Sequence, residues 1–279
     1  MSTSAPALSL TRLQQRWLVE LQLPAAFITP YVQASTASAT SAPKTAATEL
    51  QQLKALATST KAGPPSAVPT APTVVSKSAP HSAQLAHMDL AQLEHYARQC
   101  HRCDLHEQRQ QLVWAMGQAQ QPRWMVISTA PSSNEELAGL PMQGKRGELF
   151  RNQLHSIGLD VQSTMYFTQL LKCHSSQPAQ SSYIAACQAL LWRQLELVQP
   201  QHLLLLGAEP ARLFFGAQAQ LNTLRGQVQI WQSPQGVSIP TVISEDPSHL
   251  LLHPQRKAKA WADMLLIAHL DQKAALANR

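Results

Sequence analysis

Short apolar strand patterns alternate with helical patterns over residues 89–270, and this alternation constrains the fold more than any other feature. The strand patterns cover residues 124–129, 165–171, 202–206, 228–231 and 241–244, and the helical patterns cover residues 147–157, 183–198, 209–215 and 255–270. Asp89 is placed to cap a further helix that runs through Gln99. Strands that alternate with helices favour a mainly parallel sheet with helices on both faces. We therefore predict a three-layer α/β domain over residues 85–272, followed by a tail at 273–279.

A low-complexity segment at residues 34–84 precedes this domain. Ala, Ser, Thr and Pro dominate it, as in ASTASATSAP and GPPSAVPTAP, and it contains no aromatic residue. Such a composition cannot bury enough apolar surface to fold. We predict a disordered linker, whose flexible reach would be on the order of 40 Å.

A short amphipathic helix is predicted within residues 1–33, before the linker. Leucine and tryptophan recur there at spacings of three and four until Pro24 interrupts the pattern. A tethered helix with an apolar stripe can dock in the groove of a partner. We therefore predict a partner-binding peptide, with a helix folded back onto the main domain as the alternative. The predicted anchors are Leu13, Trp17, Leu18, Leu21 and Leu23.

Composition and charge argue against a membrane-spanning protein and leave nucleic acid open as a partner. No apolar run approaches the roughly 20 residues that a membrane helix needs, and the N-terminus lacks the apolar core of a signal peptide. The 22 Lys and Arg outnumber the 16 Asp and Glu, giving a formal net charge of +6. This charge permits contact with DNA without defining a basic patch. We expect a cytoplasmic protein that does not contact membranes.

Four cysteines form a candidate metal site. Cys100 and Cys103 make a CxxC pair, and Cys173 and Cys187 follow singly. In a reducing compartment such cysteines favour a metal site over disulfides. The spacing suits either an iron–sulfur cluster or zinc. The alternative is that the two single cysteines are ordinary small buried residues.

Several motifs, in the same order along the chain, resemble those of the family 4 uracil-DNA glycosylases. STAPSSNEELAGLPMQGKRGELF at residues 128–150 overlays on the family pattern GEAPGxxEDxxGxPFVGxAGxLL, and CHRCDLHEQR resembles its CxxCxLxxxR opening. MYFTQLLKC, CQALLWRQLELVQP, LRG and DPSHLLLHPQRK resemble further family motifs, the last of them HPxxLLRxPxxK. The resemblance spans residues 90–270 and implies the family's glycosylase-like three-layer fold. It also implies that the four cysteines hold a structural [4Fe-4S] cluster rather than zinc.

The resemblance locates the positions that would carry out uracil excision, and all three differ from the family. Where the family has a Glu near the attacking water, an Asn at the uracil edge and a His beside the leaving group, this chain has Thr129, Gln169 and Asp246. Loss of one preorganised donor typically costs about 10²–10³ in rate. An ionised Asp246 would also repel a departing uracil anion by on the order of 4 kcal/mol. We therefore predict a site that has lost its catalytic residues.

Other residues of the motifs leave a rewired site open. Glu135 and His249 are the residual catalytic candidates, and Met142 stands where the family has an aromatic side chain that can pack on a base. We interpret Glu135 and Glu136 as a solvated acidic pair that caps a helix.

A glycosylase-like domain without its catalytic residues, preceded by a Trp- and Leu-rich helix, resembles the psi subunit of the bacterial DNA polymerase III holoenzyme. This resemblance implies a non-catalytic adaptor whose N-terminal peptide docks on clamp-loader subunits and whose folded domain binds the chi subunit. We predict the adaptor. The alternatives are a divergent [4Fe-4S] uracil-DNA glycosylase acting in base excision repair, and a module that binds DNA bases without excising them.

Overall fold

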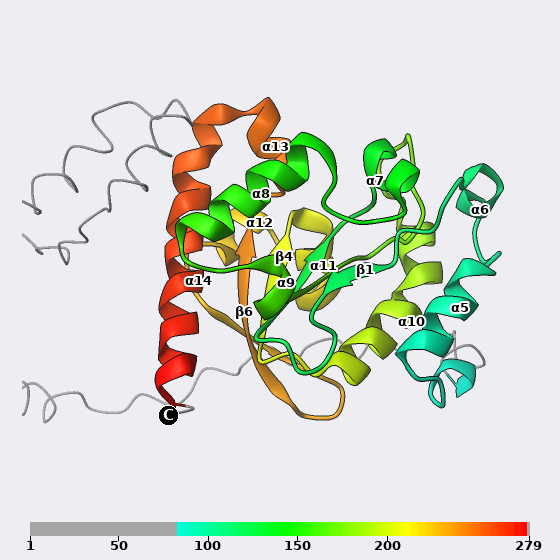
Figure 1. Cartoon of the computed structure of the whole chain (residues 1–279), viewed down its shortest axis with the longest axis horizontal. Helices are drawn as coiled ribbons and strands as arrows, with labels where there is room; N and C mark the ends of the chain where they lie inside the picture. The colour runs from blue at the N-terminus through cyan, green and yellow to red at the C-terminus, as the bar shows by residue number, and fades with distance from the viewer. Residues whose placement is uncertain (1–82, 278–279) are drawn as a thin grey trace, which may run out of the picture.

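A six-stranded mixed sheet forms the centre of the domain (Figure 1). The computed structural model describes residues 83–277. The strands are β1 Ala115–Gly117, β2 Trp124–Ser128, β3 Met165–Gln169, β4 His202–Leu206, β5 Gln229–Gln232 and β6 Ser238–Ser244, in the order β1-β3-β2-β4-β6-β5. β3, β2, β4 and β6 run parallel, whereas β1 and β5 pair antiparallel at the edges. The predicted parallel sheet is confirmed at its centre, and the two edges make the whole sheet mixed.

Helices cover both faces of this sheet. They are α5 Leu90–Arg98, α6 Leu105–Gln108, α7 Ser133–Ala138, α8 Gly144–Ser156, α9 Val161–Thr164, α10 Ser181–Val198, α11 Ala208–Phe215, α12 Leu221–Leu224, α13 Pro247–Leu252 and α14 Lys257–Ala277, with a 3-10 turn η2 at Pro254–Arg256. In Figure 1, α8 and α14 lie together on one side of the domain, and α5 lies beside α10 at the opposite end. No helix of the described residues is long and apolar enough to cross a membrane.

Burial of both sheet faces explains the layered arrangement. Every residue of β2 and β4 is buried. Because side chains alternate along a strand, Trp124 and Val126 of β2 enter the core cluster shared with α8 and α14, whereas Met125 and Ile127 enter the cluster shared with α10 and α11. These continuous apolar strands are typical of parallel sheets that are covered on both sides.

Most of the predicted helices are present, within a few residues. Asp89 caps α5 as predicted, accepting a hydrogen bond from the Gln92 backbone N–H at 2.8 Å. α8 begins three residues earlier than predicted, and α14 continues to Ala277, so residues 273–277 of the predicted tail are helical. The predicted N-terminal helix with its anchors from Leu13 to Leu23, and the linker up to residue 82, lie outside the described residues.

Candidate functional site

The carboxyl ends of the parallel strands bring the three predicted site positions to one edge of the sheet. Thr129 directly follows β2, Gln169 is the last residue of β3, and Asp246 is the second residue after β6. Gly207, which follows β4, lies between two of them: a Cβ built on it would be 3.6 Å from both the Thr129 Oγ1 and the Asp246 Cβ. Ligands of α/β sheets bind at this edge. These residues therefore define the candidate site.

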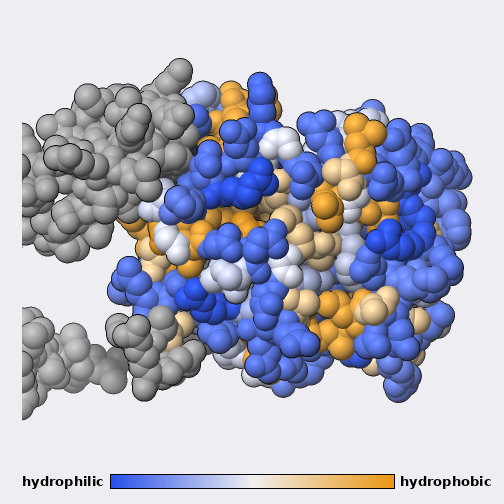
Figure 2. Space-filling view, in the orientation of Figure 1, coloured by the Kyte–Doolittle hydropathy of each residue, from blue (hydrophilic) through white to orange (hydrophobic). Residues whose placement is uncertain are grey.

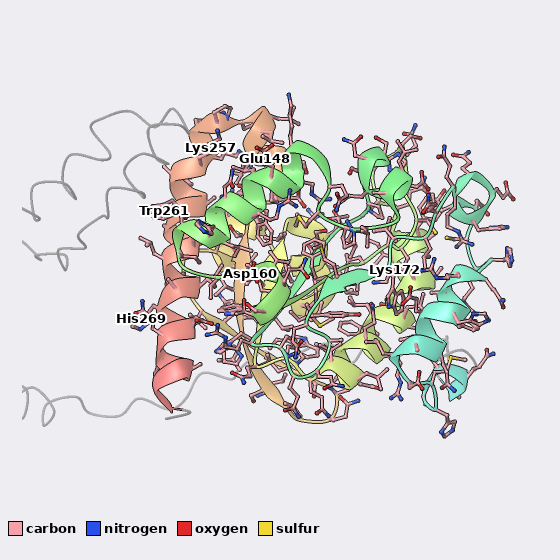
Figure 3. The ribbon with its side chains drawn as sticks, viewed as in Figure 1. Glu148, Asp160, Lys172, Lys257, Trp261 and His269 are labelled. Carbon is pink, nitrogen blue, oxygen red and sulfur yellow. The ribbon has the colours of Figure 1, made fainter. Side chains whose placement is uncertain are left out.

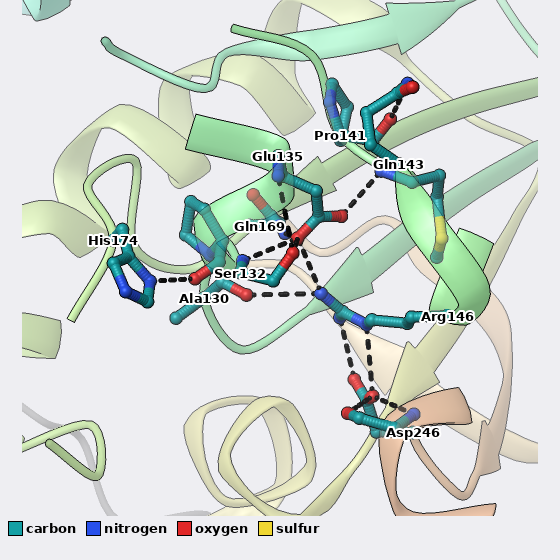
Figure 4. A network of polar contacts seen from close by, with 12 residues as sticks. Ala130, Ser132, Glu135, Pro141, Gln143, Arg146, Gln169, His174 and Asp246 are labelled. Carbon is teal, nitrogen blue, oxygen red and sulfur yellow. Dashed lines mark hydrogen bonds and ion pairs between the residues drawn. The ribbon is translucent and has the colours of Figure 1, made fainter. Parts of the chain in front are cut away.

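A buried arginine on α8 connects the candidate site (Figure 4). The Arg146 guanidinium donates to both carboxylate oxygens of Asp246, with Nε–Oδ1 at 3.2 Å and Nη2–Oδ2 at 2.8 Å. Its Nη1 donates to Glu135 Oε2 at 2.9 Å and to the Ala130 carbonyl at 3.3 Å. The Arg146 side chain is only 9% exposed. The family pattern has alanine at this position, so the motif match could not indicate the role of the arginine.

Glu135 is a buried partner of Arg146. Its Oε1 accepts from the Met142 backbone N–H at 2.6 Å, and its Oε2 accepts from the Ser132 backbone N–H at 2.7 Å and hydroxyl at 2.9 Å. Glu135 takes part in the capping box of α7, as a helix-capping acid should. However, Glu135 is 0% exposed and Glu136 is 6% exposed, so the prediction of a solvated pair is wrong. The Arg146 cation compensates the Glu135 charge that burial would otherwise penalise.

The carboxylate of Asp246 is also paired, which changes the electrostatics predicted for the site. Asp246 caps α13 and accepts hydrogen bonds from the Ser248 backbone N–H at 2.9 Å and from the Ser248 hydroxyl, in addition to Arg146. Burial lowers the pKa of Arg146, but Asp246 and Glu135 together raise it above its ordinary value. The guanidinium therefore remains charged. The predicted repulsion of a uracil anion assumed a lone Asp246. Arg146 reduces that repulsion, but its single charge is shared with Glu135 and does not cancel both carboxylates.

Met142 lies in the core and is not placed to stack on a base. Its side chain is 0% exposed and belongs to the cluster around Phe150. Its φ of 58° lies in the left-handed region, which is costly for a residue other than glycine. Glu135 accepts from its N–H, and Arg151 Nη1 donates to its carbonyl at 2.6 Å. These contacts hold the segment between α7 and α8 in place.

Three buried polar atoms at the strand ends have no hydrogen-bond partner among residues 83–277: Ser128 Oγ, Gln169 Oε1 and Glu245 Oε2. The Gln169 amide nitrogen donates to Glu135 Oε2 at 3.4 Å, which leaves the amide oxygen as the available acceptor. Glu245 Oε2 lies 3.8 Å from Nδ1 of His249, an exposed residue of α13. Sequence reasoning named Gln169 and His249 but missed Glu245, although it directly precedes Asp246.

The four cysteines line a single pocket. Cys100 and Cys103 follow α5, Cys173 follows β3, and Cys187 lies on α10. Burial raises the pKa of Cys187 to about 12, and it also raises the pKa of Cys173, so the unliganded groups are neutral thiols. Within the part of the chain that the structure describes, no group of three or more His, Cys, Asp or Glu is arranged to hold a metal ion.

A buried lysine connects the cysteine pocket with the strand-end site. Lys172 lies beside α10 (Figure 3) and lines the cysteine pocket. Its Nζ donates to the Gln169 carbonyl and to Thr168 Oγ1, both at 2.6 Å, and to Gln194 Oε1 at 2.7 Å. Burial lowers the pKa of Lys172 to about 7, and these three contacts satisfy its amino group away from water.

Comparison with known proteins shows what the chain is similar to. The family model described as the uracil DNA glycosylase superfamily matches residues 114–265. A type-4 uracil-DNA glycosylase of Archaeoglobus fulgidus is 27% identical over 183 residues, which is 62% of this chain and 89% of the relative. That of Pyrobaculum aerophilum is 24% identical over 185 residues, 64% of this chain and 93% of the relative. That of Saccharolobus solfataricus is 27% identical over 163 residues, 56% of this chain and 74% of the relative.

These relatives contradict the predicted function. All three are named as glycosylases, and their matches cover 56–64% of the chain, so the prediction of a non-catalytic clamp-loader adaptor is wrong. The alternative, a divergent glycosylase, agrees better with the comparisons. The prediction failed because it judged the site from three substituted positions and did not foresee the buried Arg146 that faces one of them.

Proposed function

The chain belongs to the uracil-DNA glycosylase superfamily, and on that basis we propose that it is a divergent DNA glycosylase that hydrolyses the N-glycosidic bond of uracil in DNA. One observation carries this proposal: the family match over residues 114–265 includes all the strand ends that converge on Thr129, Gln169 and Asp246. The proposal assigns the chemistry to residues that differ from those of the family pattern.

Arg146 is the proposed source of positive charge at the site. Excision breaks the bond between the sugar C1′ and the base nitrogen, water adds to C1′, and the base leaves as an anion that needs donors where its charge develops. A guanidinium has five N–H donors, and the contacts with Asp246, Glu135 and Ala130 use four of them. The fifth, on Nη2, has no hydrogen-bond partner within residues 83–277. It lies beside the position where the family has its His.

His249 and Glu245 are the proposed second donor group. The buried Glu245 carboxylate accepts from Arg225 and Arg256 through Oε1, and its free Oε2 faces His249 Nδ1 at 3.8 Å. At 3.8 Å this contact is an ion pair when the imidazole is protonated, and it leaves the other ring nitrogen available to act on a substrate. His249 is one helical turn from Asp246, the position where the family has its His. This spacing supports the proposal that the histidine donor has moved along α13.

Gln169 is the proposed reader of the base. Because its amide nitrogen is directed at the Glu135 carboxylate, the buried Oε1 is presented as an acceptor. The uracil edge offers one N–H donor between two carbonyl groups, and that N–H would satisfy the orphaned oxygen. Because the Gln169 Oε1 would be satisfied only when such a base is bound, the site should favour bases that present an N–H donor at this edge.

Exposed leucines flank the candidate site and support contact with DNA. Leu137 and Leu140 in or near α7 are 62% and 50% exposed, and Leu251 and Leu252 of α13 are 42% and 73% exposed. Apolar surface is visible over both helices in Figure 2. DNA-binding proteins insert such side chains between bases, while Lys and Arg contact phosphates. Lys257 and Lys259, at the start of α14, are the proposed phosphate contacts.

The four cysteines are proposed to hold a [4Fe-4S] cluster, as the family resemblance implies. The donor set fits, because four sulfurs and no competing carboxylate line the pocket. Four thiolates also suit zinc, and it is the family resemblance that favours the cluster. When bound, it would cross-link α5, β3 and α10.

The test is excision from single-stranded and double-stranded oligonucleotides that contain one uracil, using the full chain purified anaerobically. We expect abasic sites at the uracil, detected by alkaline cleavage. Arg146→Gln and His249→Ala should each lower the single-turnover rate by roughly 10²-fold or more. His253→Ala, an exposed histidine just past α13, is the matched control and should leave the rate unchanged. A folded, iron-loaded chain that produces no abasic sites would refute the proposal.

A further inference from the structure

We propose that Arg109 is a positioning residue of the cysteine site: it fastens the CxxC segment to Cys173 and donates a hydrogen bond to the Cys173 sulfur. The inference rests on the cluster of the proposed function, but not on excision. It assigns to one side chain both the retention of the cluster and part of its reduction potential.

Arg109 bridges two segments that are distant in sequence. Its Nη2 donates to the Arg98 carbonyl at 2.8 Å, and its Nη1 is 3.5 Å from the Ala97 carbonyl and 3.4 Å from the Cys100 carbonyl. These carbonyls belong to the last turn of α5 and the residue that begins the CxxC pair. The same Nη1 is 3.6 Å from Cys173 Sγ, which comes from the segment after β3.

The chemistry of the guanidinium suits this position. Helices end with carbonyl groups that lack partners, and a cation there satisfies them and complements the helix dipole. The planar guanidinium of Arg109 donates to these carbonyl groups and also directs one N–H at the sulfur of Cys173. The ammonium group of a lysine cannot reproduce this planar arrangement of donors. Hydrogen bonds to the sulfurs and nearby positive charge are two of the levers that set the reduction potential of an iron–sulfur cluster.

The chain provides a matched control at the other end of the same helix. Arg193 of α10 donates to the Met88 carbonyl through Nε at 3.1 Å and Nη2 at 2.8 Å, just before the cap of α5. It therefore anchors α5 as Arg109 does, but it does not line the cysteine pocket. Substitution of Arg193 therefore weakens the attachment of α5 but leaves the N–H···S contact of Arg109 intact. It measures the effect of α5 alone on the cysteine site.

The experiment compares full-chain Arg109→Gln, Arg109→Lys and Arg193→Gln with the wild type, all purified anaerobically. Iron per chain, the decay of visible absorbance in air and an EPR-monitored redox titration are measured. We expect Arg109→Gln to lose iron roughly tenfold faster or more and its midpoint potential to shift to a more negative value. Arg109→Lys should show a smaller shift of the same sign. Arg193→Gln should keep the wild-type potential and decay.

Each outcome bears on the inference. A redox titration of Arg109→Gln requires that this variant retains enough cluster. Where it does not, the inference is still supported if the variant loses iron faster than Arg193→Gln and if Arg109→Lys shows the shift in midpoint potential. Equal potentials and equal decay in all four proteins would overturn it, as would a wild-type chain that contains no iron. An iron-loaded wild type that excises no uracil would refute the proposed function alone and leave the role of Arg109 standing.

Discussion

At the residue scale, Arg146 determines the electrostatics of the candidate site. It pairs with Asp246 and Glu135, which are distant from each other in the sequence and are both buried. The single cation therefore supports two carboxylates. Its removal would leave both of them without compensation in a region of low dielectric.

Arg146→Ala should accordingly destabilise the domain by about 3–5 kcal/mol, the usual cost of breaking a buried ion pair by removing one partner. Urea unfolding followed by circular dichroism measures the free energy. Arg212→Ala removes a pair with Glu209 in which both side chains are partly exposed, so it should cost less than about 1 kcal/mol. Equal losses in the two variants would show that the Arg146 network contributes little to stability.

Gly147→Ala should destabilise the segment between α7 and α8. A Cβ on Gly147 would lie 1.8 Å from the Met142 carbonyl oxygen, and that backbone is held by Glu135 and Arg151. The loss is expected at the upper end of the roughly 1–3 kcal/mol typical of overpacking. Thermal unfolding monitored by circular dichroism checks it, and an unchanged melting temperature would contradict the contact.

At the element scale, apolar periodicity was sufficient to predict the core strands but not the edges. β4 was predicted to the residue, from the short run of four leucines after His202. β1 is only three residues long and half-buried, so it has no periodic signal. A helix capped by Glu135 and Glu136 was inferred without bounds at α7. α13 could also have been found, since Asp246-Pro247 places an N-cap before proline.

The site could be predicted only in part. The motif match located Thr129, Gln169, Asp246 and the four cysteines, because each stands within a motif that resembles the family pattern. The pairing of Arg146 with Asp246 joins residues 100 positions apart. A single sequence does not reveal which distant residues contact each other. The charge of Asp246 was therefore considered without its partner, and the function was misassigned.

The free energy of unfolding should depend on pH through His202, the first residue of β4, which packs against β2. His202 at the start of β4 stacks on Trp124 with centroids 4.8 Å apart, and burial lowers its pKa below 6.5. The unfolded chain then binds a proton before the folded chain does, so stability is lost as the pH falls through 6.5. Urea unfolding at about pH 7.5 and about pH 5.5 measures this loss. His202→Gln should reduce the pH dependence, and an identical dependence in both proteins would contradict the assignment.

At the scale of the whole molecule, a short stretch after β3 joins the two sites. Gln169 contacts Glu135 in the strand-end site, and Cys173, four residues later, lines the cysteine pocket. Lys172 fixes this stretch through the Gln169 carbonyl and Gln194 on α10. The cluster would thus hold one wall of the candidate site in position.

Cys173→Ser should therefore reduce iron content, lower the melting temperature and slow excision together. Serine preserves the size of the side chain but is a poor ligand for iron. Iron analysis, calorimetry and the oligonucleotide assay are applied to the same preparation. Ser176→Ala, an exposed position three residues further on, is the control. Full excision by an iron-free Cys173→Ser chain would show that the two sites are independent.

The most direct test of the central claim is detection of free uracil released by the wild-type chain. Anaerobically purified protein is incubated in excess over a uracil-containing oligonucleotide, and the released base is identified by mass spectrometry. We expect stoichiometric uracil from this substrate and a loss of roughly 10²-fold in rate for Arg146→Gln. A folded, iron-containing protein that releases no uracil, or an Arg146→Gln variant that releases it at the wild-type rate, would refute the proposed glycosylase activity or the role of Arg146 in it.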